Sequence, residues 1–245
     1  MAHMIVAGNW KMNASKSAVT KLLSGLKQGV ATVTGAQLLV FPPFPYLAQV
    51  QAELSATNIH IGVQNICAAD KGAYTGEVSL AMAKEFGASY VLVGHSERRA
   101  LYAENDTQVA AKYVATQAAQ LTPILCVGET LEERQQGLTL SVVSRQIEAV
   151  IAAAGGASFA NAVIAYEPVW AIGTGMIPKS KDLFKIIKFI KSKFKDKQPK
   201  VLYGGSVSSQ NINNLKEINN IDGFLIGGAS QNANKFIDIV KKTYS

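Results

Sequence analysis

Eight short apolar segments alternate along the chain with longer segments of helical periodicity, and this alternation limits the possible folds more than any other feature. Several of the apolar segments are rich in Val, Ile and Leu without polar alternation, which is typical of parallel strands buried on both faces. The predicted strands cover residues 4–7, 37–41, 59–63, 90–93, 123–127, 162–166, 200–203 and 223–226. Apolar residues recur at helical spacing between them, at 17–28, 45–54, 76–86, 106–120, 139–154 and 181–194.

A β-α unit repeated eight times predicts a closed (β/α)₈ barrel, and the length of 245 residues suits one such domain. An open doubly wound sheet is the alternative, but it usually has fewer repeats and a glycine-rich nucleotide fingerprint. The segment GTGMIP at 173–178 lacks the third glycine, and no GxxxxGK[ST] motif occurs. No linker divides the chain. We therefore expect one α/β barrel domain at 4–245, with residues 1–3 a remnant of an expression vector.

The net charge of +7 comes largely from lysines between positions 179 and 200. Apolar residues recur at helical spacing within this stretch, so the lysines are expected to form the solvated face of one amphipathic helix. We therefore expect no nucleic-acid partner. The alternative is a non-catalytic binding protein that uses this basic helix as its contact surface.

Cysteine content and hydropathy indicate the type of compartment. Cys67 and Cys126 are far apart, and no Cys/His cluster has metal-ligand spacing, so we expect a reducing environment and no metal site. No uncharged apolar run approaches the length of about 18 residues that a membrane span needs. These features predict a soluble, cytoplasmic protein with no membrane partner.

In a (β/α)₈ barrel the residues that follow the carboxyl ends of the strands gather at one mouth, where polar side chains have a functional reason to occur. The sequence supplies acids, bases, cations and anion-binding glycines at these positions. The candidates are Asn9 and Lys11 after the first strand, His95 and Glu97 after the fourth, Glu167 after the sixth, Ser206 after the seventh, and Gly227 and Gly228 after the eighth.

Glu167 and His95 are the candidate proton-transfer groups. Glu167 precedes a proline, which restricts the backbone and leaves a carboxylate at the end of a buried strand, where it can act as a general base. The alternative is an ion-pair partner for a neighbouring cation. His95 opens a helix, whose dipole disfavours the imidazolium form, so a neutral imidazole that donates to substrate oxygens is expected. A capping or merely packed histidine is the alternative.

The remaining candidates suit an anionic substrate. Lys11 supplies a cation and Asn9 a hydrogen-bond donor where negative charge develops, although a solvated surface role is the alternative for both. Gly227 and Gly228 are expected to open the last helix and present backbone N–H groups to a phosphate. Ser206 offers an amide and a hydroxyl, and Gly173 adds a donor from the loop after Glu167.

Five segments carry a specific resemblance: NWKMN at 9–13, GHSERR at 94–99, AYEPVWAIGTG at 165–175, YGGSV at 203–207 and GGAS at 227–230. In this order and spacing they resemble the triosephosphate isomerase family. The resemblance implies a homodimeric barrel that interconverts dihydroxyacetone phosphate and glyceraldehyde 3-phosphate through an enediolate, in glycolysis and gluconeogenesis. It also implies that the protein uses no metal and no organic cofactor.

The resemblance further implies roles for single residues. Glu167 matches the family's base and His95 its neutral electrophile, while Glu97 matches a glutamate that supports the lysine at position 11. Thr75 matches a threonine in a loop that docks beside the partner's active site. The segment 168–178 resembles the family's closing lid, but its Met-Ile-Pro end departs from the usual sequence. The alternative is another barrel enzyme acting on a phosphorylated sugar, which would share Ser206, Gly227 and Gly228 but need not share Lys11, His95 and Glu167 together.

Overall fold

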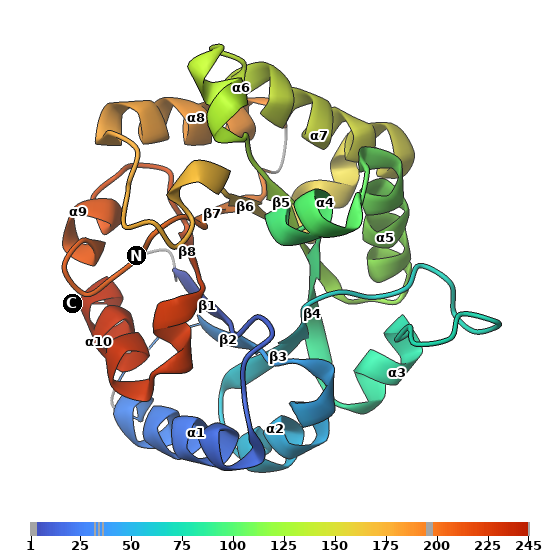
Figure 1. The fold of residues 1–245 in the computed structure, drawn as a ribbon, viewed down its shortest axis with the longest axis vertical. Coiled ribbons are helices and arrows are strands. Elements are labelled where there is room, and N and C mark those ends of the chain that lie inside the picture. The colour runs from blue at the N-terminus through green and yellow to red at the C-terminus, as the bar shows by residue number, and fades with distance from the viewer. Residues whose placement is uncertain (1–3, 32, 34, 36, 195–197, 245) are drawn as a thin grey trace.

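Eight parallel strands close into a barrel in the computed structural model, which describes residues 4–31, 33, 35, 37–194 and 198–244. Each strand pairs with its neighbour in sequence, and β8 pairs with β1 to close the sheet. Helices form a ring outside the strands (Figure 1). The predicted single-domain (β/α)₈ barrel is confirmed, whereas the expected vector remnant at residues 1–3 lies outside the described residues.

The strands agree closely with the predicted apolar segments. They are β1 Ile5–Asn9, β2 Gln37–Phe41, β3 Ile59–Val63, β4 Ala88–Val93, β5 Thr122–Val127, β6 Val163–Tyr166, β7 Lys200–Tyr203 and β8 Gly223–Ile226. Most of their residues are buried on both faces, because one face packs inside the barrel and the other against the helices. This double burial explains the uninterrupted apolar runs in the sequence.

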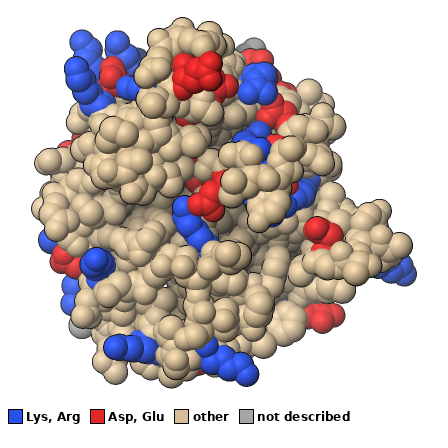
Figure 2. All heavy atoms as spheres, in the orientation of Figure 1, with Lys and Arg blue, Asp and Glu red and all other residues tan. Residues whose placement is uncertain are grey.

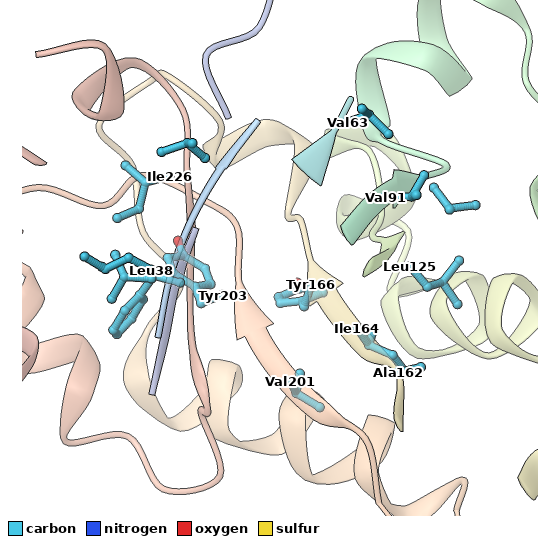
Figure 3. Packing of buried hydrophobic residues seen from close by; sticks show 14 of the residues in the cluster. Leu38, Val63, Val91, Leu125, Ala162, Ile164, Tyr166, Val201, Tyr203 and Ile226 are labelled. Atoms are coloured by element: carbon cyan, nitrogen blue, oxygen red, sulfur yellow. The ribbon is translucent and has the colours of Figure 1, made fainter. Parts of the chain in front are cut away.

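The core has two layers. The inner layer fills the barrel with side chains from alternate strand positions, including Ile5, Ala7, Leu39 and Phe41. The Phe41 ring occupies the space beside Gly62, where an added Cβ would lie 2.1 Å from Phe41 Cε1. The outer layer joins the strands to the helices, as the labelled side chains in Figure 3 show. The barrel is therefore a packed core rather than a channel.

The helices vary more than the strands in their agreement with the sequence. They are α1 Lys16–Val30, α2 Leu47–Leu54, α3 Leu80–Glu85, α4 Ser96–Tyr102, α5 Asp106–Ala118, α6 Leu131–Gln135, α7 Thr139–Ala154, α8 Ser180–Ser192, α9 Ile212–Lys216 and α10 Ala233–Tyr244. The helix predicted at 76–86 begins only at Leu80, because the Ser79 side chain accepts the Met82 N–H and caps it there. Among the described residues, no helix has the length and apolar character of a membrane span.

The basic helix α8 has the orientation that its periodicity predicts. Leu183, Ile187 and Ile190 are buried, and Lys181 and Lys185 are exposed. Figure 2 shows basic groups gathered at the corner of the molecule over α8, while acidic and basic groups are interspersed elsewhere on this face. Of the other lysines in this stretch, those at 195 and 197 lie outside the described residues.

An aromatic stack between the barrel's outer helices provides a test of the packing. Phe159 is fully buried, with its ring centroid 4.9 Å from that of Tyr113 and 4.7 Å from that of Phe194. We predict that Phe159→Ala lowers the free energy of unfolding by about 3–5 kcal/mol, because it leaves a cavity in the outer layer. Urea unfolding measures this, with the exposed Leu140→Ala as the control, for which we expect a loss below about 0.5 kcal/mol. Equal losses in the two variants would contradict this description of the core.

Candidate functional site

The carboxyl ends of the strands surround a pocket of about 270 Å³. Its lining includes eight of the residues that the sequence singled out: Asn9, Lys11, His95, Glu167, Gly173, Ser206, Gly227 and Gly228. Glu97 is not part of this lining and reaches the pocket through its contact with Lys11. Thr75 is exposed on the loop between β3 and α3, which projects from the barrel (Figure 1).

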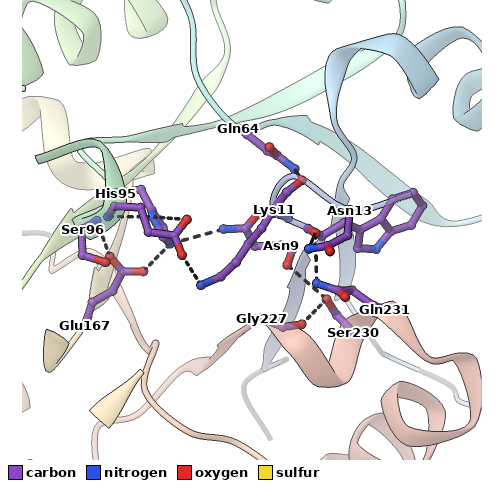
Figure 4. A network of polar contacts seen from close by, with 12 residues as sticks. Asn9, Lys11, Asn13, Gln64, His95, Ser96, Glu167, Gly227, Ser230 and Gln231 are labelled. Carbon is purple, nitrogen blue, oxygen red and sulfur yellow. Dashed lines mark hydrogen bonds and ion pairs between the residues drawn. The ribbon is translucent and has the colours of Figure 1, made fainter. Parts of the chain in front are cut away.

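Lys11 is held in an unusual backbone conformation at the end of β1. Its φ of 55° lies in the left-handed region, which is costly for a residue with a side chain. The Lys11 N–H donates to Asn9 Oδ1 at 3.0 Å, and Gln64 Nε2 donates to the Lys11 carbonyl at 2.9 Å. These bonds between Lys11, Asn9 and Gln64 fix the turn (Figure 4). The Lys11 ammonium group donates to Glu97.

Glu167 follows β6 and is only 2% exposed. Its N–H donates to the Val127 carbonyl at 2.7 Å, and Gly128 packs directly against its backbone, where an added Cβ would lie 1.8 Å from the Glu167 carbonyl oxygen. The side chain has two close partners. Oε2 accepts the Ser96 N–H at 3.0 Å, and Oε1 lies 3.1 Å from His95 Nε2. Each of the two carboxylate oxygens is therefore held by a neighbouring group.

These contacts keep Glu167 ionised although it is buried. Burial raises the pKa of Glu167, but its interactions with His95 and the hydrogen bond from the Ser96 N–H lower this pKa by more. The net shift is downward from the ordinary value for glutamate. A carboxylate that is charged at neutral pH and shielded from water can accept a proton from carbon.

His95 is the N-cap of α4, and its ring is oriented by the backbone that follows. Nδ1 accepts the Glu97 N–H at 3.2 Å, so this nitrogen carries a lone pair and the proton of the neutral ring is on Nε2. Burial lowers the pKa of His95, whereas the neighbouring Glu167 raises it by more. A proton on Nδ1 would oppose the Glu97 N–H, and we therefore assign the neutral ring, with Nε2–H directed at Glu167.

The glycines after β8 have a different local structure from the one the sequence predicts. Gly228 begins a short 3₁₀ helix, Gly228–Gln231, and the last α-helix starts only at Ala233, because Ser230 Oγ donates back to the Gly227 carbonyl at 2.7 Å and closes a tight turn. No atom lies within 4 Å of a Cβ built on Gly228, so a bound group can approach its backbone closely.

Ser206 has a role that the sequence did not predict. Its hydroxyl accepts the Gly175 N–H at 3.1 Å and donates to the Ala171 carbonyl at 2.6 Å. The hydroxyl therefore holds the loop 168–178 over the pocket, whereas the sequence assigned it to an anion. At the other end of the loop, Trp170 Nε1 donates to the buried Glu129 at 2.9 Å.

Several further groups that shape the site carry weak sequence signals. The Ser96 N–H that donates to Glu167 is a backbone group, so the residue type does not reveal it. Only the position of Ser96 directly after His95 indicates this donor. Glu129 and Gln64 each follow a strand, which marks them as polar residues at the mouth, but their partners come from other strands.

Burial raises the pKa of the Cys126 thiol well above its usual range, so this cysteine packs as a protonated side chain. In the described part of the chain, no group of three or more His, Cys, Asp or Glu side chains could hold a metal ion.

Comparison with known proteins agrees with this geometry. The sequence model of the triosephosphate isomerase family matches residues 4–243. A triosephosphate isomerase of Thiobacillus denitrificans is 51% identical over 98% of both chains. Those of Dechloromonas aromatica and Vesicomyosocius okutanii are 47% and 45% identical, each over 98% of this chain and 99% of the relative. The match covers nearly the whole barrel, and this chain therefore belongs to the triosephosphate isomerase family.

Proposed function

We propose that this protein interconverts dihydroxyacetone phosphate and D-glyceraldehyde 3-phosphate, in glycolysis and gluconeogenesis. The observation that carries the proposal is the meeting of Glu167, His95 and Lys11 at one pocket of suitable size for a three-carbon phosphate ester. The relatives named above are triosephosphate isomerases, and the match extends over nearly all of this chain. We further propose that the reaction needs neither a metal ion nor an organic cofactor.

Glu167 is the proposed base. Its carboxylate takes a proton from C1 of dihydroxyacetone phosphate, and the C–H electrons form the C1=C2 bond of an enediolate while the carbonyl electrons move to oxygen. A proton then passes from the C1 hydroxyl to the C2 oxygen, and the protonated Glu167 returns its proton to C2 while the electrons on the C1 oxygen form the aldehyde carbonyl. Burial of the carboxylate beside Ser96 and His95 supports this role, because the reaction needs a charged base that water does not reach.

The other polar side chains stabilise the enediolate. A neutral His95 donates from Nε2 to its oxygens, and Asn9, whose Nδ2 lies 3.3 Å from that nitrogen, donates to the same region. The Lys11 ammonium offsets the negative charge of the enediolate and the phosphate. Glu97 is a positioning residue that holds the ammonium through the ion pair between them.

Backbone groups are the proposed phosphate site. Gly173, Ser206, Gly227 and Gly228 line the same pocket as Glu167, and their N–H groups are the proposed donors to the phosphate, which glycine lets come close. The loop 168–178, which the Ser206 hydroxyl holds over the pocket, would cover the bound phosphate and exclude water from the enediolate, which otherwise can eliminate phosphate.

We also propose that the protein is a homodimer. Five large apolar side chains on the segments after β1, β3 and β4 are more than half exposed, which is unusual for a monomer: Met12, Tyr74, Met82, Leu101 and Tyr102. The projecting loop that carries Thr75 would dock beside the partner's pocket.

We also propose a cytoplasmic location, since Cys67 and Cys126 are both free thiols.

The role of Glu167 can be tested by removing its charge alone. We predict that Glu167→Gln lowers kcat by about 10³, because the base acts in the transition state, while the affinity for inorganic phosphate changes little. A coupled enzyme assay with glyceraldehyde 3-phosphate as the substrate measures turnover. The control is Lys179→Ala with Lys185→Ala, which we expect to leave turnover unchanged. Near-normal turnover in Glu167→Gln would refute the assignment.

The pH dependence of kcat/KM reports the environment of the same carboxylate. Because the pKa of Glu167 is lowered, activity should be lost only as the pH falls below the ordinary range for glutamate. We predict that His95→Ala moves this acidic limb to higher pH, since it removes contacts that lower the pKa and leaves burial, which raises it. Steady-state kinetics across pH measure the limb, with Lys185→Ala as the control. A limb that stays in place or moves to lower pH would contradict the pairing of these two residues.

The homodimer is tested by placing a charge on the projecting loop. We predict that Tyr74→Asp converts the dimer to a monomer in sedimentation experiments and lowers turnover, because burying an unpaired carboxylate is costly. Leu140→Asp, which alters an exposed apolar residue on α7, should stay dimeric. A dimer in both variants would show that this loop lies outside any interface.

A further inference from the structure

The carboxyl end of β5 extends beyond its neighbour β4. The strand β4 pairs with β5 only as far as Leu125, whereas β6 stays paired with β5 up to Val127. Beyond its last paired residue, the chain of β4 turns away at Gly94, whose φ is 69°, and enters α4. This turn brings the Ser96 N–H to Glu167, and it leaves the edge of β5 that faces β4 without a neighbouring strand.

A side chain takes the place of the missing strand at this edge. The Val127 carbonyl accepts the Glu167 N–H on the β6 side at 2.7 Å, so the backbone groups of the next residue, Gly128, point to the opposite side. There Gln146 Oε1 accepts the Gly128 N–H at 2.8 Å, and Gln146 Nε2 donates to the Gly128 carbonyl at 3.2 Å. One side-chain amide therefore satisfies both backbone groups, which need partners away from water.

Gln146 itself lies in an apolar face of α7. It is only 5% exposed, and the other buried residues of this helix are Val142, Val143, Ile147 and Val150. A buried amide in such surroundings is costly unless its oxygen and nitrogen are both hydrogen-bonded. The backbone of Gly128 meets both requirements, and the apolar pattern of the helix gives no other reason for a glutamine at this position.

Gly128 is in direct contact with the backbone of the proposed base. A Cβ built on Gly128 would lie 1.8 Å from the Glu167 carbonyl oxygen and 2.6 Å from the Glu167 carbonyl carbon. On the other side of Gly128, the Glu129 carbonyl accepts the Val169 N–H at 3.1 Å. Residues 127–129 and 167–169 are thus joined along their length, so a shift of Gly128 displaces Glu167.

We propose that Gln146 is a positioning residue for Glu167: by pairing both backbone groups of Gly128, it fixes the end of β5 against which the Glu167 backbone rests. Gln146 is not part of the lining of the pocket at the barrel mouth, and it acts through Gly128 rather than on the substrate. The inference rests on the proposed function, since it gives Gln146 a part in that reaction.

The effect falls on kcat, because a misplacement of about 1 Å in a reacting group can cost about 10² in rate. Gln146→Met keeps the length of the side chain and removes both the donor and the acceptor. We expect it to lower kcat at least about tenfold and to change KM less than about threefold, because the proposed phosphate donors belong to other strand ends. The coupled assay, run well below the melting temperature, measures both constants.

The pH profile gives a second measure of the carboxylate. The Ser96 amide, His95 and Lys11 lower the pKa of Glu167, whereas burial raises it. A displaced carboxylate loses part of these contacts and stays buried, so its pKa rises. The acidic limb of kcat/KM should therefore move to higher pH in Gln146→Met. A residue that only stabilises the fold would leave the limb in place.

Gln117→Met is the matched control. Gln117 on α5 also donates its side-chain amide to a backbone carbonyl, that of Ser158, which lies just before the amino end of β6 and so at the other end of the barrel. We expect this variant to lose stability in urea unfolding while its kcat and its acidic limb stay native. If Gln146→Met does not fold, Gln146→Asn replaces it, because this side chain keeps the amide but is one methylene shorter. Its kcat should fall by about threefold to tenfold.

Native kcat and an unmoved acidic limb in a folded Gln146 variant would overturn the proposal, as would an equal loss of kcat in Gln117→Met. A crystal structure of the same variant tests the displacement without any assay. The distance from the Ser96 nitrogen to Glu167 Oε2, now 3.0 Å, should exceed about 3.5 Å, and an unchanged distance would overturn the proposal. Absence of turnover in the native protein would contradict the proposed function instead, and the crystal structure would still decide the role of Gln146.

Discussion

The pairing of β8 with β1 is the constraint on which the rest of the structure depends. It closes the sheet, so that residues far apart in sequence end at the same mouth: Asn9 and Lys11 stand beside Gly227, and His95 lies 86 positions from Asn9 yet within 3.3 Å of it. An open sheet would leave β1 and β8 at opposite edges. The inner layer of side chains fills the barrel and makes this closed arrangement rigid, which a site built from several strands requires.

Burial disfavours the charged form of the Glu167 carboxylate, and its surroundings offset that cost in free energy. A charged group out of water is stable only with hydrogen bonds and neighbouring charge. Glu167 receives the Ser96 amide and faces the Nε2–H of a ring whose other nitrogen accepts the Glu97 amide. The first residues of α4 thus orient both the base and the imidazole, and the side chain of Glu97 also holds Lys11. One short helix links all three groups.

Much of the fold and the gathering of the candidate residues at one pocket follow from the sequence, because double burial gives each strand an apolar run and the barrel brings every strand end to one place. The strand at 59–63 and the helix at 139–154 have the predicted bounds. The short helices α6 and α9 were not predicted, since five residues show no periodicity. The late start of α3 and the 3₁₀ turn after Gly227 depend on single serine hydrogen bonds. The Ser96 amide and the loop contacts of Ser206 depend on partners from other strands, which no local pattern reveals.

The central claim is that Glu167, His95 and Lys11 act together on one phosphate-anchored three-carbon substrate. A crystal structure with 2-phosphoglycolate, a planar carboxylate joined to a phosphate ester, tests this most directly. The account predicts that the phosphate binds the amides of Gly173, Ser206, Gly227 and Gly228, and that the carboxylate lies between Glu167 and His95 within reach of Lys11. Phosphate bound elsewhere, or a ligand that contacts none of these three side chains, would contradict it.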